Sequence, residues 1–199
     1  MQTNYKTRIK RGIIGLGVGL SATLGATAAQ AANHITTGGI APAPIGHVRF
    51  CSQFPAECQR QDRARKPQLT KSLWQQIVAV NAKVNRLVQP VTDAEYYATE
   101  EFWTYPGAYG DCEDYVLMKR HLLVQAGWKP ANLLIAVVRQ GDGSGHAVLV
   151  ARTRQGDFVL DNLDHEVRRW SQTPYRYVRL QSPRHAGHWL QVRDRRAGF

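Results

Sequence analysis

Apolar residues recur every three or four positions in the segment that follows Thr70. This spacing places them on one face of an α-helix, and threonine is a side chain that commonly caps a helix N-terminus. Pro90 cannot continue the helix, because proline has no backbone N–H to donate. The pattern therefore predicts an amphipathic helix over residues 71–88. Its apolar face would consist of Leu73, Ile77, Val80, Val84 and Leu87.

A second helix is predicted over residues 112–125, where an Ala-Gly pair follows the last residue. Asp111 is a favourable N-cap, and Asp114 stands three residues later at the position of a capping box, although Glu or Gln is more usual there. Cys112 is then the first residue of the helix. The residues that would bury one side of it are Val116, Leu122 and Leu123.

After Pro130 the pattern changes from helical periodicity to short apolar runs separated by glycine-rich turns. The runs LLIAVVR (133–139), HAVLVAR (146–152) and FVLDN (158–162) are typical of β-strands, and EVRRW, YRYVRL and HWLQV predict further short strands. Short turns between successive strands favour antiparallel pairing. We therefore predict an α+β fold in which N-terminal helices pack on an antiparallel β-sheet arranged as a meander.

The first 31 residues have the pattern of a bacterial signal peptide. Four basic residues precede an uncharged apolar run, IIGLGVGLSATLGATAA, and an A-x-A cleavage site follows it. A permanent membrane anchor is the alternative, but the run is short and rich in Gly, Ala and Thr, which favours cleavage. We therefore expect a periplasmic protein without a stable membrane anchor. Residues 1–31 would be the signal peptide, 32–48 a flexible lead-in, and 49–199 one domain.

The chain is 43% hydrophobic and 21% charged, which is typical of a globular domain rather than a disordered chain. Its formal charge is +11, and removal of a signal peptide that holds four basic and no acidic residues would leave +7. Such a charge could favour anionic partners such as cell-envelope polymers, or the basic residues could be solvated strand ends. Nucleic acid is not an expected partner, because the chain is predicted to be exported and carries no nucleic-acid-binding motif.

The chain has three cysteines, and two of them lie close together in the segment FCSQFPAEC. Pro55 turns the chain between Cys51 and Cys58, and export makes a disulfide between them chemically favourable. Two alternatives stay open: both could be free, or one could pair with Cys112. If Cys51 and Cys58 pair, Cys112 is left over, either as a small buried side chain or as a reactive thiol.

Cys112, His146 and Asp161 form a candidate catalytic set. A cysteine at a helix N-terminus is activated, because the helix dipole and free N–H groups favour the thiolate. His146 begins one strand and Asp161 ends the next. If the turn between these strands centres between Arg154 and Gln155, the two side chains are diagonal neighbours on one face, whereas a shift of one residue separates them. Each residue alone has an ordinary structural explanation; their combination favours catalysis.

Two segments carry a family resemblance. GDCEDYVLMKRHLLVQAGW, followed by GHAVLVARTRQGDFVLDN, resembles the bacterial transglutaminase-like cysteine peptidases over roughly residues 96–189. That family includes periplasmic calcium-dependent proteases that clip biofilm adhesins. The resemblance implies a papain-like or transglutaminase-like fold. It also implies a triad in which Cys112 is the nucleophile, His146 the general base and acid, and Asp161 the residue that orients the imidazole.

Three acidic residues, Asp111, Glu113 and Asp114, flank Cys112. They suit the positive end of a helix, but like-charge repulsion from them would raise the pKa of the thiol. A bound Ca²⁺ would offset that repulsion, because carboxylate oxygens are its preferred ligands. The resemblance implies that these three acids are the calcium ligands. Three acids are too few for six to eight ligand positions, so other oxygens must contribute.

These observations predict an exported cysteine peptidase that cleaves a protein substrate in the cell envelope, with calcium as the implied cofactor. A membrane protein could regulate access to the cysteine. The alternatives are a protein-crosslinking transglutaminase or a cell-envelope amidase with the same triad, and a non-catalytic envelope binding protein that keeps the fold. The presence of all three candidate triad residues counts against the last alternative.

Overall fold

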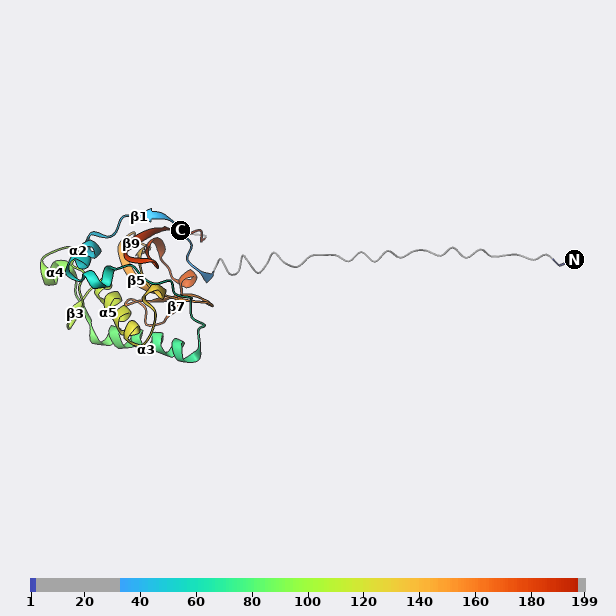
Figure 1. Cartoon of the computed structure of the whole chain (residues 1–199), viewed down its shortest axis with the longest axis horizontal. Coiled ribbons are helices and arrows are strands. Elements are labelled where there is room, and N and C mark those ends of the chain that lie inside the picture. Colours follow the sequence, from blue (N-terminus) through green and yellow to red (C-terminus); the bar gives the residue numbers. More distant parts are fainter. Residues whose placement is uncertain (3–32, 197–199) are drawn as a thin grey trace.

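The protein is described by a computed structural model over residues 1–2 and 33–196 (Figure 1). Almost all of the predicted signal peptide therefore lies outside the described residues. Within the described residues, no helix is both long enough and apolar enough to cross a membrane.

The larger layer is a seven-stranded antiparallel sheet with the strand order β1-β9-β8-β4-β5-β6-β7. Strands predicted at residues 133–139, 146–152 and 158–162 are confirmed as β4, β5 and β6, with small shifts at their ends. The strands are β1 (Thr37–Ala41), β4 (Leu133–Arg139), β5 (Gly145–Thr153), β6 (Gly156–Leu160), β7 (Arg168–Arg169), β8 (Arg176–Ser182) and β9 (His185–Val192).

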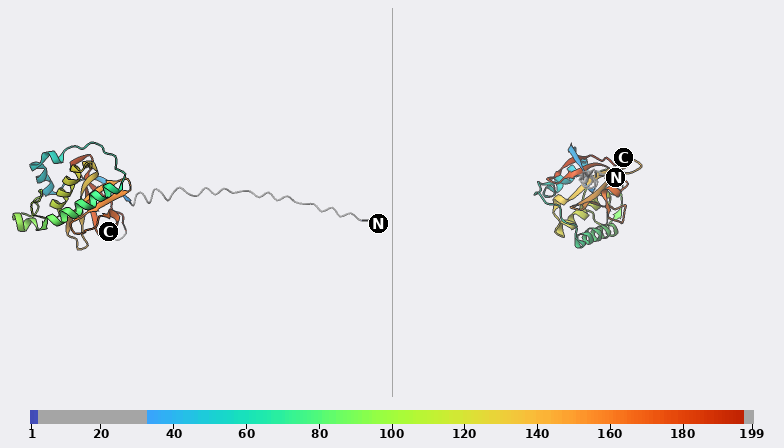
Figure 2. Two further views of the ribbon diagram at one scale, coloured as in Figure 1. Left: turned by 90° about the horizontal axis from the view of Figure 1, so that it is seen from below. Right: turned by 90° about the vertical axis from the view of Figure 1, so that its right-hand side faces the viewer.

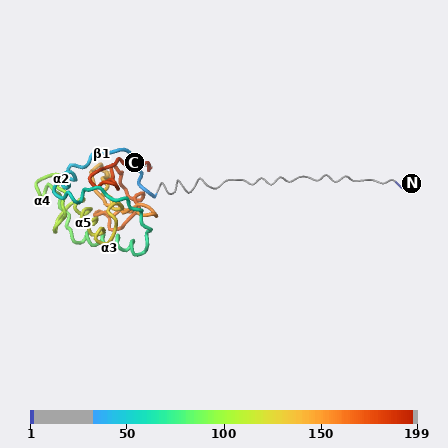
Figure 3. The backbone as a smooth tube through the Cα atoms, viewed as in Figure 1, coloured from blue at the N-terminus to red at the C-terminus, as the bar shows by residue number. Residues whose placement is uncertain are grey.

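The prediction of a simple meander is correct for only half of the sheet. Strands β4 to β7 follow one another, but β8 returns to pair with the opposite edge of β4. Strands β9 and β1 then extend that side, so the first and last strands lie next to each other (Figure 3). Strand β4 is consequently internal. It is buried on both faces, which explains its continuous apolar run.

The helices precede the main part of the sheet along the chain. Elements outside the large sheet are α2 (Ile45–Gln53), η1 (Pro55–Cys58), α3 (Lys71–Leu87), β2 (Gln89–Pro90), α4 (Asp93–Tyr97), β3 (Tyr109–Gly110), α5 (Cys112–Gln125), η2 (Pro130–Asn132) and η3 (Trp170–Gln172). Strands β2 and β3 form a separate short parallel pair, and this pair brings α4 close to the start of α5.

Both predicted helices are confirmed. Helix α3 ends one residue earlier than expected, and its cap forms as predicted, because the Thr70 hydroxyl accepts a hydrogen bond from the Leu73 N–H at 3.2 Å. Helix α5 has the predicted bounds. Of the three states left open for Cys51 and Cys58 by the sequence, the structure shows the disulfide between them.

The expectation of an irregular lead-in over residues 32–48 is wrong. Residues 37–41 form β1, which pairs with β9, and α2 begins at Ile45. The Gly- and Pro-rich composition suggested a loop, but an edge strand depends on its partner, and that partner lies about 150 residues further along the chain.

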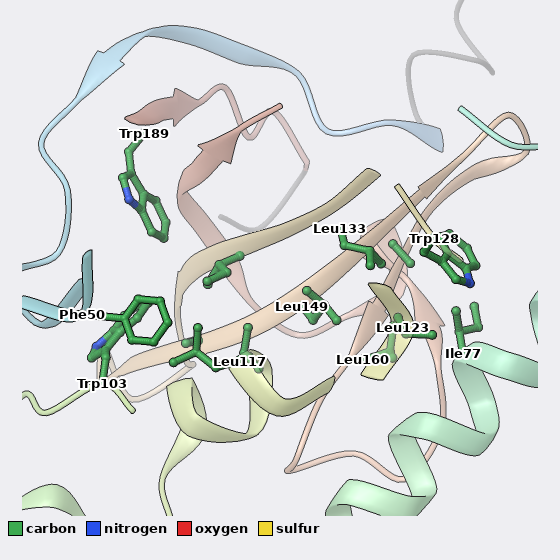
Figure 4. Close-up of a cluster of buried hydrophobic side chains, with 14 of the residues drawn as sticks. Phe50, Ile77, Trp103, Leu117, Leu123, Trp128, Leu133, Leu149, Leu160 and Trp189 are labelled. Atoms are coloured by element: carbon green, nitrogen blue, oxygen red, sulfur yellow. The ribbon is translucent and has the colours of Figure 1, made fainter. Parts of the chain in front are cut away.

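One apolar core lies between α5, α3 and the sheet (Figure 4). Helix α5 packs along β5, and α3 packs against α5 and β6. Leu123 and Leu149 are fully buried in this core, as is Ile77 from α3. Burial of each such side chain contributes about 2 to 3 kcal/mol. The core therefore fixes α5 against β5, and with it the position of Cys112 relative to His146.

Candidate active site

Cys112 is the first residue of α5. Helical hydrogen bonding begins with the Tyr115 N–H, which donates to the Asp111 carbonyl at 3.2 Å. The preceding N–H groups have no partner within the helix and favour negative charge at its N-terminus. Cys112 is a free cysteine, since Cys51 and Cys58 are bonded to each other. The thiol therefore stands where a thiolate would be stabilised by the backbone.

His146 and Asp161 are brought together by the pairing of β5 with β6. Leu149 lies opposite Leu160, which is the register expected for a turn centred between residues 154 and 155. His146 and Asp161 consequently share a face, and His146 Nε2 lies 2.8 Å from Asp161 Oδ1. Both side chains are buried. This bond uses one imidazole nitrogen and leaves Nδ1 to act on a neighbouring group.

Asp161 is held by several donors. The Tyr175 hydroxyl donates to Asp161 Oδ2 at 2.5 Å, and the Leu163 N–H donates to Oδ1 at 3.0 Å. The Asn85 side-chain amide donates to the Asp161 carbonyl at 2.8 Å. Burial alone would raise the pKa of Asp161, but the hydrogen bonds from His146 and Tyr175 and the charge of His146 outweigh it, so the pKa is lowered. Asp161 is therefore an ionised group with a fixed orientation.

The Ala147 N–H forms a hydrogen bond to the Cys112 thiol, which favours a lower pKa of the thiol. The thiol therefore lies beside the start of β5. Its S–H donates to Glu113 Oε2 at 3.0 Å. The pKa of Cys112 is raised well above its usual value, first by burial and then by the charge and hydrogen bond of Glu113, with Asp111 adding to the effect. In this arrangement the thiol is protonated, and it needs a base or a nearby positive charge to become a nucleophile.

Three carboxylates gather beside the thiol. Oxygen atoms of Asp93, Asp111 and Glu113 lie within 4.8 Å of one another. Burial and the charge of Asp111 raise the pKa of Glu113 to about 9, and burial is also the main cause of a raised pKa at Asp111. Asp111 Oδ1 is buried and has no hydrogen-bond partner among the described residues. The cluster therefore holds more negative charge than the surrounding chain compensates.

Asp111 does not act as predicted at the helix start. It occupies the N-cap position, but its side chain makes no capping hydrogen bond. Its Oδ2 instead lies 3.4 Å from the backbone nitrogen of Asp93, at the start of α4. The prediction of a side-chain cap is therefore wrong, because the short β2–β3 pair brings α4 within reach of this carboxylate.

Asp114 lies outside the three-carboxylate cluster. Its Oδ1 accepts a hydrogen bond from the Thr104 N–H at 2.9 Å, so the side chain stabilises the loop before β3. Burial raises its pKa to about 8, and Oδ2 is buried without a partner among the described residues. The structure thus brings two of the three predicted calcium ligands, Asp111 and Glu113, together with Asp93.

Three residues of this site, Asp93, Tyr175 and Lys119, were not predicted from the sequence. Asp93 is 18 positions before Asp111, and no local pattern links the two; its carboxylate accepts a hydrogen bond from the Phe102 N–H. Tyr175 comes from the segment between η3 and β8, and its contact with Asp161 depends on the tertiary fold. Only Lys119 had a visible signal, since it lies three residues after Val116 on the predicted apolar side of α5.

Lys119 is a buried cation two helical turns after Cys112. The side chain is fully buried, and Nζ has no hydrogen-bond partner among the described residues. It lies 5.6 Å from the centre of the Tyr115 ring. Burial lowers the pKa of Lys119 to about 7, against an opposing effect from the charge of Asp161. The Lys119 amine is thus close enough to Asp161 for the two charges to act on each other.

Comparison with known protein families matches residues 37–197 to the bacterial transglutaminase-like cysteine proteinases. The chain belongs to this family. It is therefore a member of a cysteine peptidase family, and the predicted enzyme class is confirmed. No curated protein sequence matches the chain.

Two solved structures of LapG from Legionella pneumophila are similar to this cysteine peptidase family member. The calcium-bound form is 25% identical, with a TM-score of 0.50, over 58% of this chain and 67% of that one. The EGTA-treated form is 24% identical, with a TM-score of 0.51, over 61% of this chain and 68% of that one. Together with the family match, they confirm the predicted transglutaminase-like α+β fold.

Proposed function

We propose that this protein is an exported cysteine peptidase that cleaves a protein substrate through Cys112, His146 and Asp161. The observation that carries the proposal is the buried 2.8 Å bond between His146 and Asp161, next to a helix-start thiol on which the Ala147 N–H acts. Membership of a cysteine peptidase family supports it. Cysteine peptidases need this combination of a nucleophile, a base and a group that orients the base.

In the proposed reaction, His146 takes the proton from Cys112 Sγ, and the sulfur attacks the carbonyl carbon of the scissile peptide. The negative charge on the tetrahedral oxygen is stabilised by N–H groups at the start of α5. His146 then donates its proton to the leaving amine, which departs and leaves a thioester on Cys112. Water, deprotonated by His146, hydrolyses the thioester and releases the second product. Asp161 fixes the imidazole and stabilises its charged form throughout.

We also propose that Asp93, Asp111 and Glu113 bind a calcium ion. Support comes from the clustering of three carboxylates, those of the buried Asp93 and Glu113 and the half-buried Asp111, from the unpartnered Asp111 Oδ1 and from the raised pKa of Glu113. A LapG structure of the same fold is described as calcium-bound. Water and backbone carbonyls would complete the ligand set, since calcium takes six to eight oxygens. When bound, the ion would neutralise the carboxylate charge next to Cys112.

Alkylation kinetics test both proposals without a known substrate. The rate of reaction of Cys112 with iodoacetamide is measured across pH, with calcium or with EGTA, in the parent and in Cys112→Ala, His146→Ala and His188→Ala variants. We expect His146→Ala to slow alkylation near pH 6 by about 100-fold, because the thiolate loses its partner. His188 is exposed on β9, and its substitution is the matched control.

Two outcomes would contradict these proposals separately. A Cys112 that reacts no faster than a small model thiol, with no effect of His146→Ala, would exclude the peptidase mechanism. Fast alkylation that is the same in calcium and in EGTA would exclude the calcium site and leave the triad intact. Circular dichroism of each sample identifies any variant that has lost its fold.

Export to the periplasm forms part of the same proposal. It is supported by the basic, apolar and A-x-A pattern of the first 31 residues and by the disulfide, which persists in an oxidising compartment. N-terminal sequencing of the protein recovered from a periplasmic extract should give a chain that begins at Ala32. A full-length chain recovered with the membranes would contradict signal cleavage.

A further inference from the structure

An irregular segment, residues 59–69, runs over the outside of the molecule between η1 and α3 (Figure 2). We refer to it as the strap. The Gln61 N–H donates to the Arg184 carbonyl at 2.9 Å, and the Asn132 side-chain amide donates to the Arg65 carbonyl at 3.0 Å. These bonds fix the strap at two points along its length. Its side chains are therefore presented from an anchored backbone.

Two depressions adjoin the strap and share Arg63, Ala64 and Ala131 in their walls. One has a volume of about 700 Å³ and the other of about 280 Å³. We call the pair the basic groove, because eight basic side chains line it. These are Arg60, Arg63, Arg65, Lys66, Arg120, Lys129, Arg152 and Arg184.

Positive charge in the basic groove is largely uncompensated. The acidic residues in its lining are Glu57 and Asp62, and Glu57 is already paired with Arg120 at 3.1 Å. Five of the basic residues are exposed and form no ion pair with any described residue: Arg60, Arg63, Arg65, Lys129 and Arg184. A fixed concave surface with several like charges attracts an anionic ligand.

Gln61 adds a polar group to the wall of the larger depression. Both its Nε2 and its Oε1 are buried and have no hydrogen-bond partner among the described residues. An amide supplies donors and an acceptor together, and it can pair with a peptide group or with a glycan hydroxyl. The choice of ligand therefore follows from the proposed peptidase function, which makes a polypeptide the substrate, and from the positive charge of the groove, which favours an acidic one.

The groove is separate from the candidate catalytic thiol. His121 and Val124, from the second half of α5, contribute to its wall, whereas Cys112 begins the helix. Nine residues of helix between Cys112 and His121 correspond to about 14 Å. A peptide in extended conformation would need at least about four residues to cover that distance. A ligand in the groove would thus leave the thiol accessible.

We propose that the basic groove is an exosite that binds an acidic stretch of the protein substrate, away from the scissile peptide bond. The proposal rests on the proposed peptidase function, which makes a polypeptide the substrate. Arginine is well suited to this role, because its guanidinium binds a carboxylate through two parallel hydrogen bonds.

Binding is tested on the processed chain carrying Cys112→Ala, so that no cleavage occurs. The probe is a fluorescein-labelled glutamate-rich peptide, and the matched peptide has glutamine at every glutamate. Fluorescence anisotropy at low and at physiological ionic strength should show binding of the acidic peptide alone, weakened by salt. Adding Arg63→Gln and Lys129→Gln, which remove charge from two walls of the groove, should weaken binding about fivefold to tenfold.

A matched control separates the groove from general positive charge. Arg49→Gln with Lys83→Gln removes two exposed basic residues that do not line the groove, and it should change the affinity by less than about twofold. Arg63→Lys keeps the charge but not the paired hydrogen bonds, so it should fall between the parent and the double variant. Unfolding midpoints of all variants should agree, which shows that the fold is unchanged.

Three results would overturn the proposal. The control pair could weaken binding as much as the groove pair, the groove pair could have no effect, or polygalacturonate could bind where the acidic peptide does not. Because the assay uses a chain without the thiol, its outcome does not depend on catalysis. Absence of cleavage by the parent chain would count against the proposed peptidase function, and absence of peptide binding would count against the exosite.

Discussion

Asp161 and Glu113 are buried carboxylates of the same candidate site, but their surroundings act on them in opposite directions. Asp161 accepts hydrogen bonds from Tyr175 and the Leu163 N–H and is paired with His146, and its pKa is lowered. Glu113 is buried beside other carboxylates, and its pKa is raised to about 9. The chain supplies every partner that Asp161 needs, whereas the cluster around Glu113 lacks positive charge.

This contrast divides the site into a part that the fold completes and a part that the proposed calcium ion would complete. The His146–Asp161 pair is held by the register of β5 and β6 and does not require a ligand to form. Burial raises the pKa of Cys112, and the charges of Glu113 and Asp111 raise it further as long as no cation compensates them. Removal of the Asp161 charge should therefore disable the His146–Asp161 pair. Removal of the proposed calcium ion should disable the carboxylate cluster.

The largest effect is expected from Asp161→Asn, which removes the carboxylate from the His146–Asp161 pair. Without the carboxylate, the imidazolium of His146 loses its partner, and the thiolate of Cys112 loses its counter-ion. We expect alkylation of Cys112 at pH 7 to slow by about 100-fold. Asp142→Asn, in the exposed turn between β4 and β5, is the control and should leave the rate unchanged. Equal rates in the two variants would show that Asp161 does not act on the thiol.

Calcium binding should produce the next largest effect, a rise in the free energy of unfolding, because the ion would neutralise the carboxylate cluster. At a calcium concentration 100 times the dissociation constant, the free energy of unfolding should rise by about 2.7 kcal/mol. The midpoint of thermal unfolding would then rise by about 5 to 10 °C. Asp93→Asn should remove most of this rise, and Glu100→Gln, an exposed acid that lies nearby in the sequence, should not. A rise that survives Asp93→Asn would place the ion elsewhere.

In EGTA, the cluster should make stability depend on pH. The pKa of Glu113 is about 9 in the folded chain, against an ordinary value of 4.5. Between these values the folded chain binds more protons than the unfolded chain, so the free energy of unfolding should fall as the pH rises. Urea unfolding at a series of pH values measures this decline. Glu113→Gln should reduce it, and a stability that rises over this range would contradict the assignment.

The smallest effect is expected from Tyr175→Phe, which removes one hydrogen-bond donor to Asp161. Asp161 keeps its bonds to His146 and Leu163, so the free energy of unfolding should fall by only about 1 to 2 kcal/mol. Denaturant unfolding measures the loss. Tyr96→Phe, at an exposed tyrosine of α4, provides the control. A loss below the error of the control would mean that water replaces the Tyr175 hydroxyl.

The two parts of the site also differ in how far the sequence predicts them. Helix α5 is marked in the sequence by Asp111 before it and the Ala-Gly pair after it, and the register that pairs His146 with Asp161 follows once the turn after β5 is centred between residues 154 and 155. Both are local properties of the chain. The cluster is not local, because Asp93 reaches it only through the β2–β3 pair, and that pair is too short to leave a sequence pattern.

The strand order of the sheet is also only partly predictable from the sequence. Strand β4 was predictable from its apolar residues, but its pairing with β8 was not, because β8 follows three other strands. Strand β1 contains two glycines and has no apolar alternation, so its strand conformation depends on β9. Local periodicity therefore predicts most elements, while strand order and edge strands depend on contacts between distant segments.

The Cys51–Cys58 bond has a consequence for how the thiol would survive in the oxidising compartment to which the proposed export leads. The two cysteines are only seven residues apart, so each is the nearest partner of the other along the chain. Once they have paired, Cys112 has no second cysteine in its own chain to oxidise it. A nucleophile could thus remain reduced among oxidants that form structural disulfides, because the other cysteines are already committed to each other.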